Sequence, residues 1–300
     1  MVRWDYYRRM AVNYLKEPER IGQEMAAAKR RREAKGARMT PLPPAPAAEV
    51  PVVVSLTSYG NRVQRVSLAI RSIMDQTVKP NKVILWLGED ADDVRLPQDL
   101  TDLERVGLEI RRGVADLKGH KKYYFAMQEL TDCLLVTIDD DLVYAKDTIE
   151  TLITAHRALP DCVIARRCHH IDIANGEIAP YETWEMNYQD EVATPRKSLL
   201  ATTGAGTLYP SSSFAALTGE ADEISEFALC ADDLWMKALE TKAHIMVACA
   251  PNDLPMPWVM PMSQSKGLFF ENLHDGGNDR ILARLMDHFG LTIDDFTDEG

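Results

Sequence analysis

The 300-residue sequence contains no apolar run that approaches the roughly 20 residues of a membrane-spanning helix. Its basic start, MVRWDYYRRM, lacks the apolar core that follows in a secretory signal. The five cysteines form no C-x-x-C pair, and their odd number argues against a disulfide framework or a structural zinc site. These absences predict a cytoplasmic protein whose cysteines are buried thiols.

Positive charge is scarce beyond the first 40 residues. Residues 1–40 hold 11 Lys and Arg against 5 Asp and Glu, a balance of +6, whereas the remaining 260 hold 23 against 41, a balance of −18. Such an acidic body excludes general nucleic-acid binding, because contact with phosphates needs a basic surface. An anionic ligand would have to be bound by a local positive cluster, a helix N-terminus or a metal ion.

The N-terminal part of the chain differs from the rest in composition. Residues 1–40 are basic and carry apolar residues near helical spacing, which predicts a helical extension. Residues 41–49 contain four prolines and predict an extended linker. The helix could pack on the body of the protein, or it could contact a partner or an anionic membrane surface, here the inner face of the cell membrane.

Residues 50–300 are expected to form one domain in which strands alternate with helices. This order predicts an α/β fold with a mostly parallel sheet, and ligands bind at the carboxyl ends of the strands in such sheets. The expected strands are residues 51–59, 82–88, 108–113 and 133–141, and the expected helices are residues 62–76, 119–131 and 147–158.

Three adjacent carboxylates, Asp139, Asp140 and Asp141, follow directly on the apolar run LLVTI. Adjacent carboxylates repel one another and lose solvation at a strand end, and a divalent cation would offset this cost. Because alternate residues of an extended strand point to the same side, Asp139 and Asp141 are expected to share a face while Asp140 points elsewhere. The alternative is a solvated turn that caps the next helix.

Two further motifs have both a chemical and a structural interpretation. Lys121 and Lys122 stand at an expected helix start, where they could bind an anion or simply be exposed. Asp232 and Asp233 begin another expected helix, and capping accounts for one of these carboxylates but does not need two. Tyr181 and Trp184 could stack on a sugar or be buried anchors.

Three segments, VVVSLTSYGNR, SLAIRSIMDQTVKPNKVILWL and LLVTIDDDLVY, resemble the nucleotide-binding half of bacterial glycosyltransferases with the GT-A fold. The resemblance is to the family-2-like enzymes that build capsules, lipopolysaccharides and other surface glycans, and it covers roughly residues 50–285. It implies a nucleotide-diphospho-sugar donor, a Mn²⁺ or Mg²⁺ ion, and a glycan or lipid-linked glycan acceptor. It also implies transfer with inversion, in which a carboxylate deprotonates the acceptor hydroxyl.

The resemblance also assigns roles to single residues. It implies Asp233 as the base with Asp232 as the second choice, because this sequence has Asp-Asp where the family more often has Glu-Asp. The implied metal ligands are Asp141, Asp139 and His274. The implied donor-binding residues are Thr57, Tyr59, Arg62, Asp116, Lys121, Lys122, Asp139, Asp140 and Gly206.

Other protein classes remain to be weighed against this hypothesis. A sugar nucleotidylyltransferase needs a glycine-rich, basic signature after its first strand, and SLTSYGNR lacks it. A haloacid-dehalogenase-type phosphatase needs D-x-D-x-T, whereas the triad here continues with Leu142 and Val143. A catalytically silent protein that binds glycans or nucleotide sugars, and a metal-dependent nucleotide-sugar hydrolase, stay open as alternatives.

Overall fold

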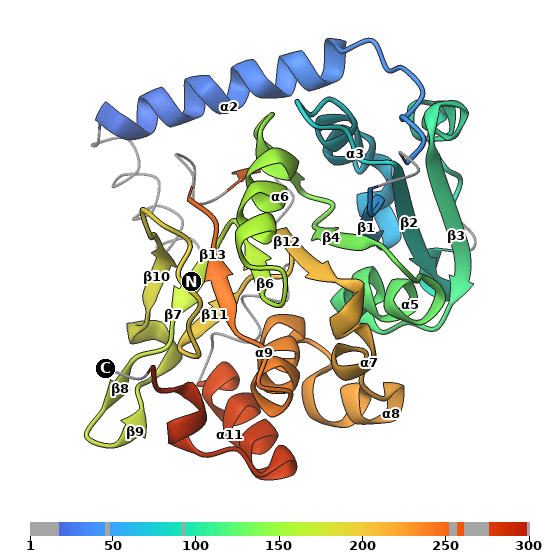
Figure 1. Ribbon diagram of the computed structural model, residues 1–300. Coiled ribbons are helices and arrows are strands. Elements are labelled where there is room, and N and C mark those ends of the chain that lie inside the picture. The colour runs from blue at the N-terminus through green and yellow to red at the C-terminus, as the bar shows by residue number, and fades with distance from the viewer. Residues whose placement is uncertain (1–17, 46–48, 92–93, 252–256, 261–275, 299–300) are drawn as a thin grey trace, which may run out of the picture.

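A seven-stranded sheet forms the centre of the protein (Figure 1). The structure, a computed structural model, describes residues 18–45, 49–91, 94–251, 257–260 and 276–298. All neighbouring strands of the sheet are parallel except at β12, which runs antiparallel to both of its neighbours. In spatial order the strands are β13 (Val247–Cys249), β6 (Val163–Ala165), β12 (Ala205–Pro210), β4 (Leu134–Ile138), β1 (Val52–Ser58), β2 (Lys82–Gly88) and β3 (Leu108–Val114).

Helices cover both faces of this sheet, so its central strands are apolar on both sides. In β1, Val52 and Val54 belong to one apolar cluster, whereas Val53 belongs to the cluster on the opposite face. Burial on both faces explains why these strands read as continuous apolar runs in the sequence. The α/β class with a mostly parallel sheet and an N-terminal helix is therefore confirmed.

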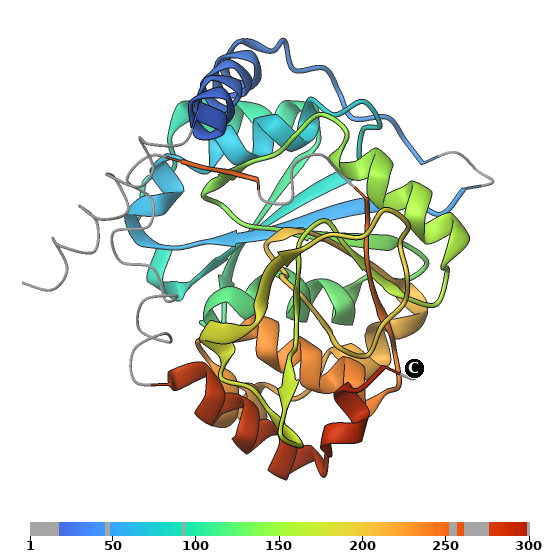
Figure 2. The same ribbon diagram turned by 90° about the vertical axis from the view of Figure 1, so that its left-hand side faces the viewer.

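The helices form two layers, above and below the sheet in the view of Figure 1. The upper layer contains α3 and α6, with α2 lying across its top, and the lower layer contains α5, α7, α8, α9 and α11 (Figures 1 and 2). Their bounds, with that of the short α4, are α2 Pro18–Gly36, α3 Ser67–Met74, α4 Gln98–Thr101, α5 Lys121–Glu129, α6 Thr148–Ala158, α7 Phe214–Leu217, α8 Ala221–Glu223, α9 Asp232–Lys242 and α11 Gly277–Phe289.

Three smaller sheets complete the strands. One has the order β10 (Glu185–Tyr188), β7 (Cys168–His170) and β11 (Leu199–Ala201). The others are the pairs β5 (Leu142–Val143) with β14 (Trp258–Val259), and β8 (Ile173–Ala174) with β9 (Glu177–Ile178).

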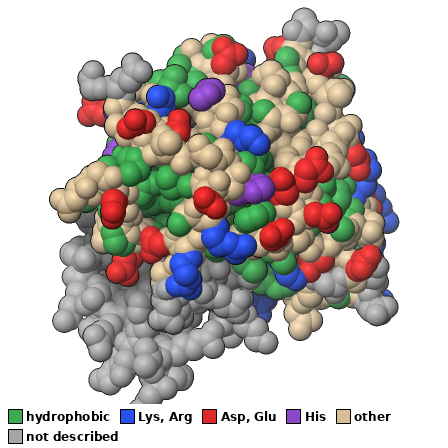
Figure 3. All heavy atoms as spheres, turned by 90° about the horizontal axis from the view of Figure 1, so that it is seen from below, with side chains coloured by type: hydrophobic (Ala, Val, Ile, Leu, Met, Phe, Trp, Pro, Cys, Tyr) green, Lys and Arg blue, Asp and Glu red, His purple; other side chains and the backbone are tan. Residues whose placement is uncertain are grey.

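Seen from below, acidic and basic side chains are interspersed with apolar ones over the lower layer, so the acidic excess is not gathered on that face (Figure 3).

The helix α2 packs on the domain, as one of the two interpretations of residues 1–40 predicted. Its inner face consists of Ala27, Arg30 and Ala34, all buried. Arg71 of α3 donates to the carbonyl oxygens of the last residues of α2, including that of Ala34 at 3.1 Å. Residues 1–17 of the expected helix lie outside the described residues. Among the described helices, none combines the length and apolarity of a membrane span.

One expected helix is divided in the structure. In place of a single helix over residues 62–76, the chain forms a 3-10 turn, Gly60–Gln64, followed by α3. In the 3-10 turn, Arg62 contacts Tyr59 and forms an ion pair with Asp140 after β4, while Val63 of the same turn is buried in the apolar cluster that the residues of α3 join.

Candidate functional site

The sheet topology brings two of the sequence motifs and the segment that contains Gly206 to one edge. The strands β1 and β4 are parallel neighbours, so their carboxyl ends, followed by Tyr59 and Asp139, lie side by side. Because β12 is antiparallel to β4, its amino end adjoins the same place, with Ala205 opposite Ile138. The segments SLTSYGNR, IDDD and TTGAG thus meet where an open α/β sheet binds its ligands.

Arg62 neutralises two of the three adjacent carboxylates. Its guanidinium forms an ion pair with Asp140, with Nε 3.1 Å from Oδ2, and its Nη2 lies 2.9 Å from Oδ2 of Asp141. Ser58 donates a further hydrogen bond of 2.5 Å to Asp140. The guanidinium carbon of Arg62 lies over the Tyr59 ring, 5.1 Å from the ring centre. Burial raises the pKa of Asp140, and Arg62 opposes that rise.

Asp139 points away from the other two carboxylates. Its Oδ1 accepts a hydrogen bond of 2.7 Å from Nζ of Lys122, while Asp140 and Asp141 share Arg62. The expectation that Asp139 and Asp141 share a face was wrong, because β4 ends at Ile138 and the alternation of a strand stops there.

Gly204 makes room for the Asp139 side chain. A Cβ atom at residue 204 would lie 1.9 Å from Oδ2 of Asp139, which no real contact allows. The backbone amide of Asp139 donates to the carbonyl oxygen of Gly204 at 2.9 Å. The glycine therefore permits both the close approach of the two backbones and the position of the carboxylate.

Lys122 connects the acidic turn to the second acidic pair. Its buried Nζ lies 2.7 Å from Oδ1 of Asp139 and 2.8 Å from Oδ2 of Asp232. Asp232 is the first residue of α9, and the cap position before it is Ala231. Neither Asp232 nor Asp233 thus occupies the capping position of α9, which was the alternative interpretation of this pair. Lys122 is buried, so the alternative that it is simply an exposed residue was wrong.

Thr203 orients both carboxylates of the Asp232–Asp233 pair. Its backbone amide donates to Oδ1 of Asp233 at 2.8 Å, and its hydroxyl lies 2.7 Å from that same atom. The hydroxyl also lies 2.8 Å from Oδ2 of Asp232, and since it carries one proton it donates to one carboxylate at a time.

The two carboxylates of this pair titrate in opposite directions. Burial works to raise the pKa of Asp232, but the ammonium of Lys122 outweighs it, and the pKa lies below its usual range. For Asp233, burial and the neighbouring Asp232 charge raise the pKa to about 6. His120, buried beneath Asp232, has its pKa lowered to about 4 by burial and is neutral at pH 7. A carboxyl group that titrates near neutrality beside one that stays ionised suits acid–base chemistry.

The fit of the acidic turn to a divalent cation depends on how its carboxylates are placed. Among the described residues, no three Asp, Glu, His or Cys side chains converge as a metal site. Mg²⁺ is commonly held by one or two carboxylates together with substrate phosphates, and Asp141 provides one such carboxylate, whereas Asp139 is turned toward Lys122. His274, the third expected ligand, lies outside the described residues.

The remaining expected donor-binding residues make other contacts. Lys121 is buried and pairs with Asp116 at 2.8 Å, so these two residues bind each other. The hydroxyl of Thr57 donates to the carbonyl oxygen of Trp86 at 2.9 Å. A Cβ atom at Gly206 would meet Thr148 rather than an acidic residue.

The two aromatic residues that could have stacked on a sugar are buried. Tyr181 and Trp184 pack against each other, with ring centres 4.7 Å apart, and Nε1 of Trp184 donates to the carbonyl oxygen of Ala179 at 2.8 Å. This is the arrangement expected of structural anchors.

Sequence reasoning missed several residues of the site. Thr203 lies three residues before Gly206, and Ser58 lies within the motif VVVSLTSYGNR, but neither had an expected role. His120 is next to the two lysines. Tyr144 follows the acidic turn, and its hydroxyl lies 2.8 Å from the backbone nitrogen of Asp139. Position beside a motif was the one available signal for each of them.

No protein-family model matches the chain, and no curated protein matches it. Among solved structures, it is similar to the mannosyltransferase PcManGT from Pyrobaculum calidifontis, in complex with GDP-Man and Mn²⁺, with a TM-score of 0.47 and 14% identity over 77% of this chain and 63% of that one. It is also similar to S. aureus TarS 1–349, with a TM-score of 0.47 and 16% identity over 80% and 71% of the two chains. The chain thus spans less than two thirds of the mannosyltransferase structure.

Proposed function

We propose that this protein is a metal-dependent glycosyltransferase of the GT-A type. It transfers a sugar from a nucleotide-diphospho-sugar donor to a hydroxyl group of a glycan or lipid-linked glycan, with inversion at the anomeric carbon. The proposal includes residues 50–300 as one catalytic domain, and the bacterial surface-glycan enzymes as the group whose motifs the sequence resembles.

One observation carries the proposal: Lys122 joins the acidic turn to the Asp232–Asp233 pair. Its Nζ lies within 2.8 Å of both Asp139 and Asp232, which belong to motifs that are far apart in the sequence. A transferase of this kind needs a site for the donor diphosphate and a base for the acceptor within one sugar's reach. The two ion pairs of Lys122 hold the acidic turn and the Asp232–Asp233 pair close together.

Asp233 has the properties of the base in this proposal. Its raised pKa, about 6, leaves it mostly ionised at pH 7 while making it a stronger base than an ordinary carboxylate. Oδ1 is held by Thr203, and within the described part of the chain Oδ2 has no hydrogen-bond partner. Oδ2 is therefore the atom to which the proton of the acceptor hydroxyl would go. Asp232 stays ionised and keeps the Lys122 ammonium in place.

The donor diphosphate would lie over the acidic turn. A Mn²⁺ or Mg²⁺ ion held by Asp141, and by Asp139 once that carboxylate turns from Lys122, would neutralise the charge that develops on the departing diphosphate. Arg62 already balances Asp140 and Asp141 and, with Tyr59, forms the side of the site that belongs to β1. His274 is proposed as a further ligand from the residues before α11.

The proposal places the enzyme in the cytoplasm, with contact to a membrane or a partner protein through residues 1–40. The outer face of α2 supports it, because Lys29, Arg32 and Lys35 are exposed there and Met25 is exposed beside them. Such a face suits an anionic lipid surface. Co-sedimentation with vesicles containing phosphatidylserine would test it, and a triple Glu variant of these basic residues should stay in the supernatant.

The experiment that tests the function is a product analysis with nucleotide-sugar donors and Mn²⁺. A transferase or hydrolase releases a nucleoside diphosphate, and a phosphatase releases phosphate. Asp233→Asn should keep donor binding and lose transfer, whereas Asp141→Asn should lose metal-dependent turnover. The proposal would be overturned if Asp141→Asn kept normal metal-dependent activity, or if a donor that binds were not turned over with any acceptor, which would favour the silent binding protein.

A further inference from the structure

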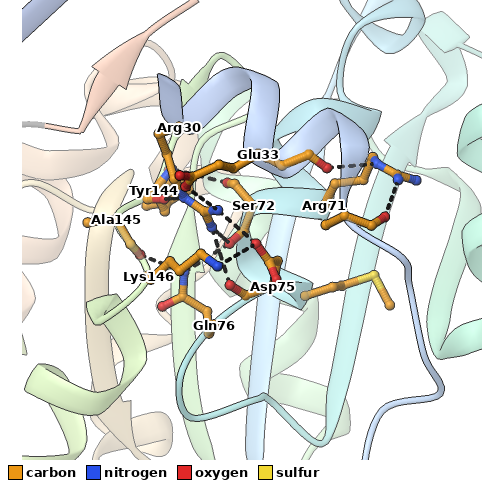
Figure 4. Close-up of polar contacts among 12 residues, drawn as sticks. Arg30, Glu33, Arg71, Ser72, Asp75, Gln76, Tyr144, Ala145 and Lys146 are labelled. Carbon is orange, nitrogen blue, oxygen red and sulfur yellow. Dashed lines mark hydrogen bonds and ion pairs between the residues drawn. The ribbon is translucent and has the colours of Figure 1, made fainter. Parts of the chain in front are cut away.

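Arg30 inserts from α2 into the domain, although it lies in a basic run whose residue Lys29 is exposed. Its side chain is 5% exposed. Nε donates to the carbonyl oxygen of Tyr144 at 3.0 Å, and Nη1 donates to Oδ2 of Asp75 at 2.8 Å. Nη2 donates to the carbonyl oxygens of Ser72, at 2.9 Å, and of Asp75, at 3.3 Å (Figure 4). A guanidinium can satisfy this set of acceptors, whereas a lysine ammonium cannot match its planar fork.

Tyr144, which accepts one of these bonds, also contacts the backbone on both sides of the site. Its side chain is fully buried, and its hydroxyl donates to the carbonyl oxygen of Gly204 at 2.6 Å. The hydroxyl oxygen of Tyr144 also accepts a bond of 2.8 Å from the amide of Asp139. Its own amide donates to the hydroxyl of Ser72 at 3.1 Å. One residue thus links Arg30 to the backbone of Asp139, the first residue of the acidic turn.

Attachment of α2 alone does not account for this arrangement. Apolar contacts suffice to hold a surface helix, and a buried guanidinium costs desolvation free energy that its hydrogen bonds must offset. The other inward residues, Ala27 and Ala34, are small, so the specific contacts of the inner face belong to Arg30. Two of the residues that it contacts, Ser72 and Tyr144, are themselves bonded to each other beside the acidic turn.

We propose that Arg30 is a positioning residue for the acidic turn and acts through Tyr144. The N-terminal helix is then part of the support of the site, with an inner face that fixes the turn and an outer face left for other contacts. The effect on the turn depends on the contacts described here alone. The effect on donor binding rests on the proposed function.

Hydrogen–deuterium exchange tests the effect on the turn without any ligand. Arg30→Ala should speed exchange in peptides covering residues 134–146 by about tenfold, because hydrogen bonds from a charged group hold this backbone. Peptides of β2 should exchange as in the wild type. Lys29→Ala is the matched control, since that neighbouring side chain is 75% exposed, and it should leave both regions unchanged. Unchanged exchange at residues 134–146, or an equal increase in β2, would overturn the proposal.

Two milder variants keep the test valid if Arg30→Ala fails to fold. Arg30→Lys retains the charge but not the fork of donors, and should speed exchange in the same peptides. Tyr144→Phe removes only the hydroxyl, and should speed exchange at Asp139. In the Tyr144→Phe background, Arg30→Lys should add little at Asp139, because the two residues act in series. Additive effects would contradict action through Tyr144.

Calorimetry with UDP or GDP and Mn²⁺ separates this proposal from the proposed function. Arg30→Lys should weaken nucleotide binding by about tenfold, whereas Lys29→Ala should bind as the wild type does. If the wild type bound neither nucleotide, nor CDP or ADP, the proposed function would fail and the exchange data would still decide the role of Arg30. Normal nucleotide binding by an Arg30 variant with a loosened turn would overturn its role in positioning the site.

Discussion

Replacing Lys122 with Met should reveal how strongly the two acidic motifs depend on one ammonium group. Methionine has a similar length and no charge, so the substitution leaves Asp139 and Asp232 without their shared partner. Removing one partner of a buried ion pair costs about 3–5 kcal/mol. Asp139 is 42% exposed and can be solvated, whereas Asp232 is 19% exposed, so most of the cost falls on Asp232. We expect a loss of about 3 kcal/mol in the free energy of unfolding at pH 8, near the lower end of that range.

The loss should depend on pH with a definite sign. In the wild type Lys122 holds the pKa of Asp232 below its usual range, so the pair stabilises the fold above the ordinary Asp pKa. Without Lys122 the pKa of Asp232 rises, and protonation relieves the unpaired charge as the pH falls. The destabilisation should therefore be smaller at pH 5 than at pH 8.

Urea unfolding followed by tryptophan fluorescence at both pH values measures this effect. Lys118→Met is the control, because that lysine is 43% exposed, pairs with Asp116, and should cost less than about 1 kcal/mol. Adding Asp232→Asn to Lys122→Met should restore part of the stability. A loss below about 1 kcal/mol at pH 8, or a larger loss at pH 5, would refute the reasoning.

Three further predictions concern other parts of the site and its surroundings. Gly204→Ala should displace the Asp139 carboxylate, which a new Cβ would meet at 1.9 Å, and cost about 1–3 kcal/mol in urea unfolding, while Gly36→Ala, with open space around it, should not destabilise. Burial raises the pKa of Glu240 to about 8, so between its ordinary pKa of 4.5 and about 8 this residue takes up a proton on folding, and stability falls as the pH rises. Glu240→Gln should remove part of that fall. Equal slopes of unfolding free energy against pH for the two proteins would exclude this. Turnover should fall as the pH drops through about 6, where Asp233 becomes protonated, and a rate that stays flat down to pH 5 would argue against this base.

Local sequence signals were sufficient for the sheet and for part of the site. Continuous apolar runs such as LLVTI predict strands buried on both faces, and the polar residues that follow two parallel strands must meet at one edge. SLTSYGNR and the acidic turn each include the end of such a strand, and they meet because β1 and β4 are parallel neighbours. The sequence reasoning failed at Asp139, because a strand period was extended one residue beyond Ile138, where β4 ends.

The remaining features depend on contacts between distant segments. The pairing of Lys122 with both Asp139 and Asp232 requires α5 and α9 to lie on the same side of the sheet, which no spacing in the sequence encodes. The burial of Arg30 within a run of basic residues is equally hidden, because its acceptors are mostly backbone carbonyls of other segments. A side chain that donates hydrogen bonds to backbone carbonyl oxygens needs no particular residue type as its partner, so the sequence contains no sign of the contact.

Binding of a nucleoside diphosphate through a metal is the central claim of this account. Titration calorimetry with UDP, GDP, CDP and ADP, in Mn²⁺ and in EDTA, tests it most directly on the wild type and on Asp141→Asn. We predict that one nucleotide binds in Mn²⁺ only, that Asp141→Asn abolishes this binding, and that a 100-fold excess over Kd stabilises the fold by about 2.7 kcal/mol. Binding that survives both EDTA and Asp141→Asn, or no binding of any of the nucleotides in Mn²⁺, would contradict it.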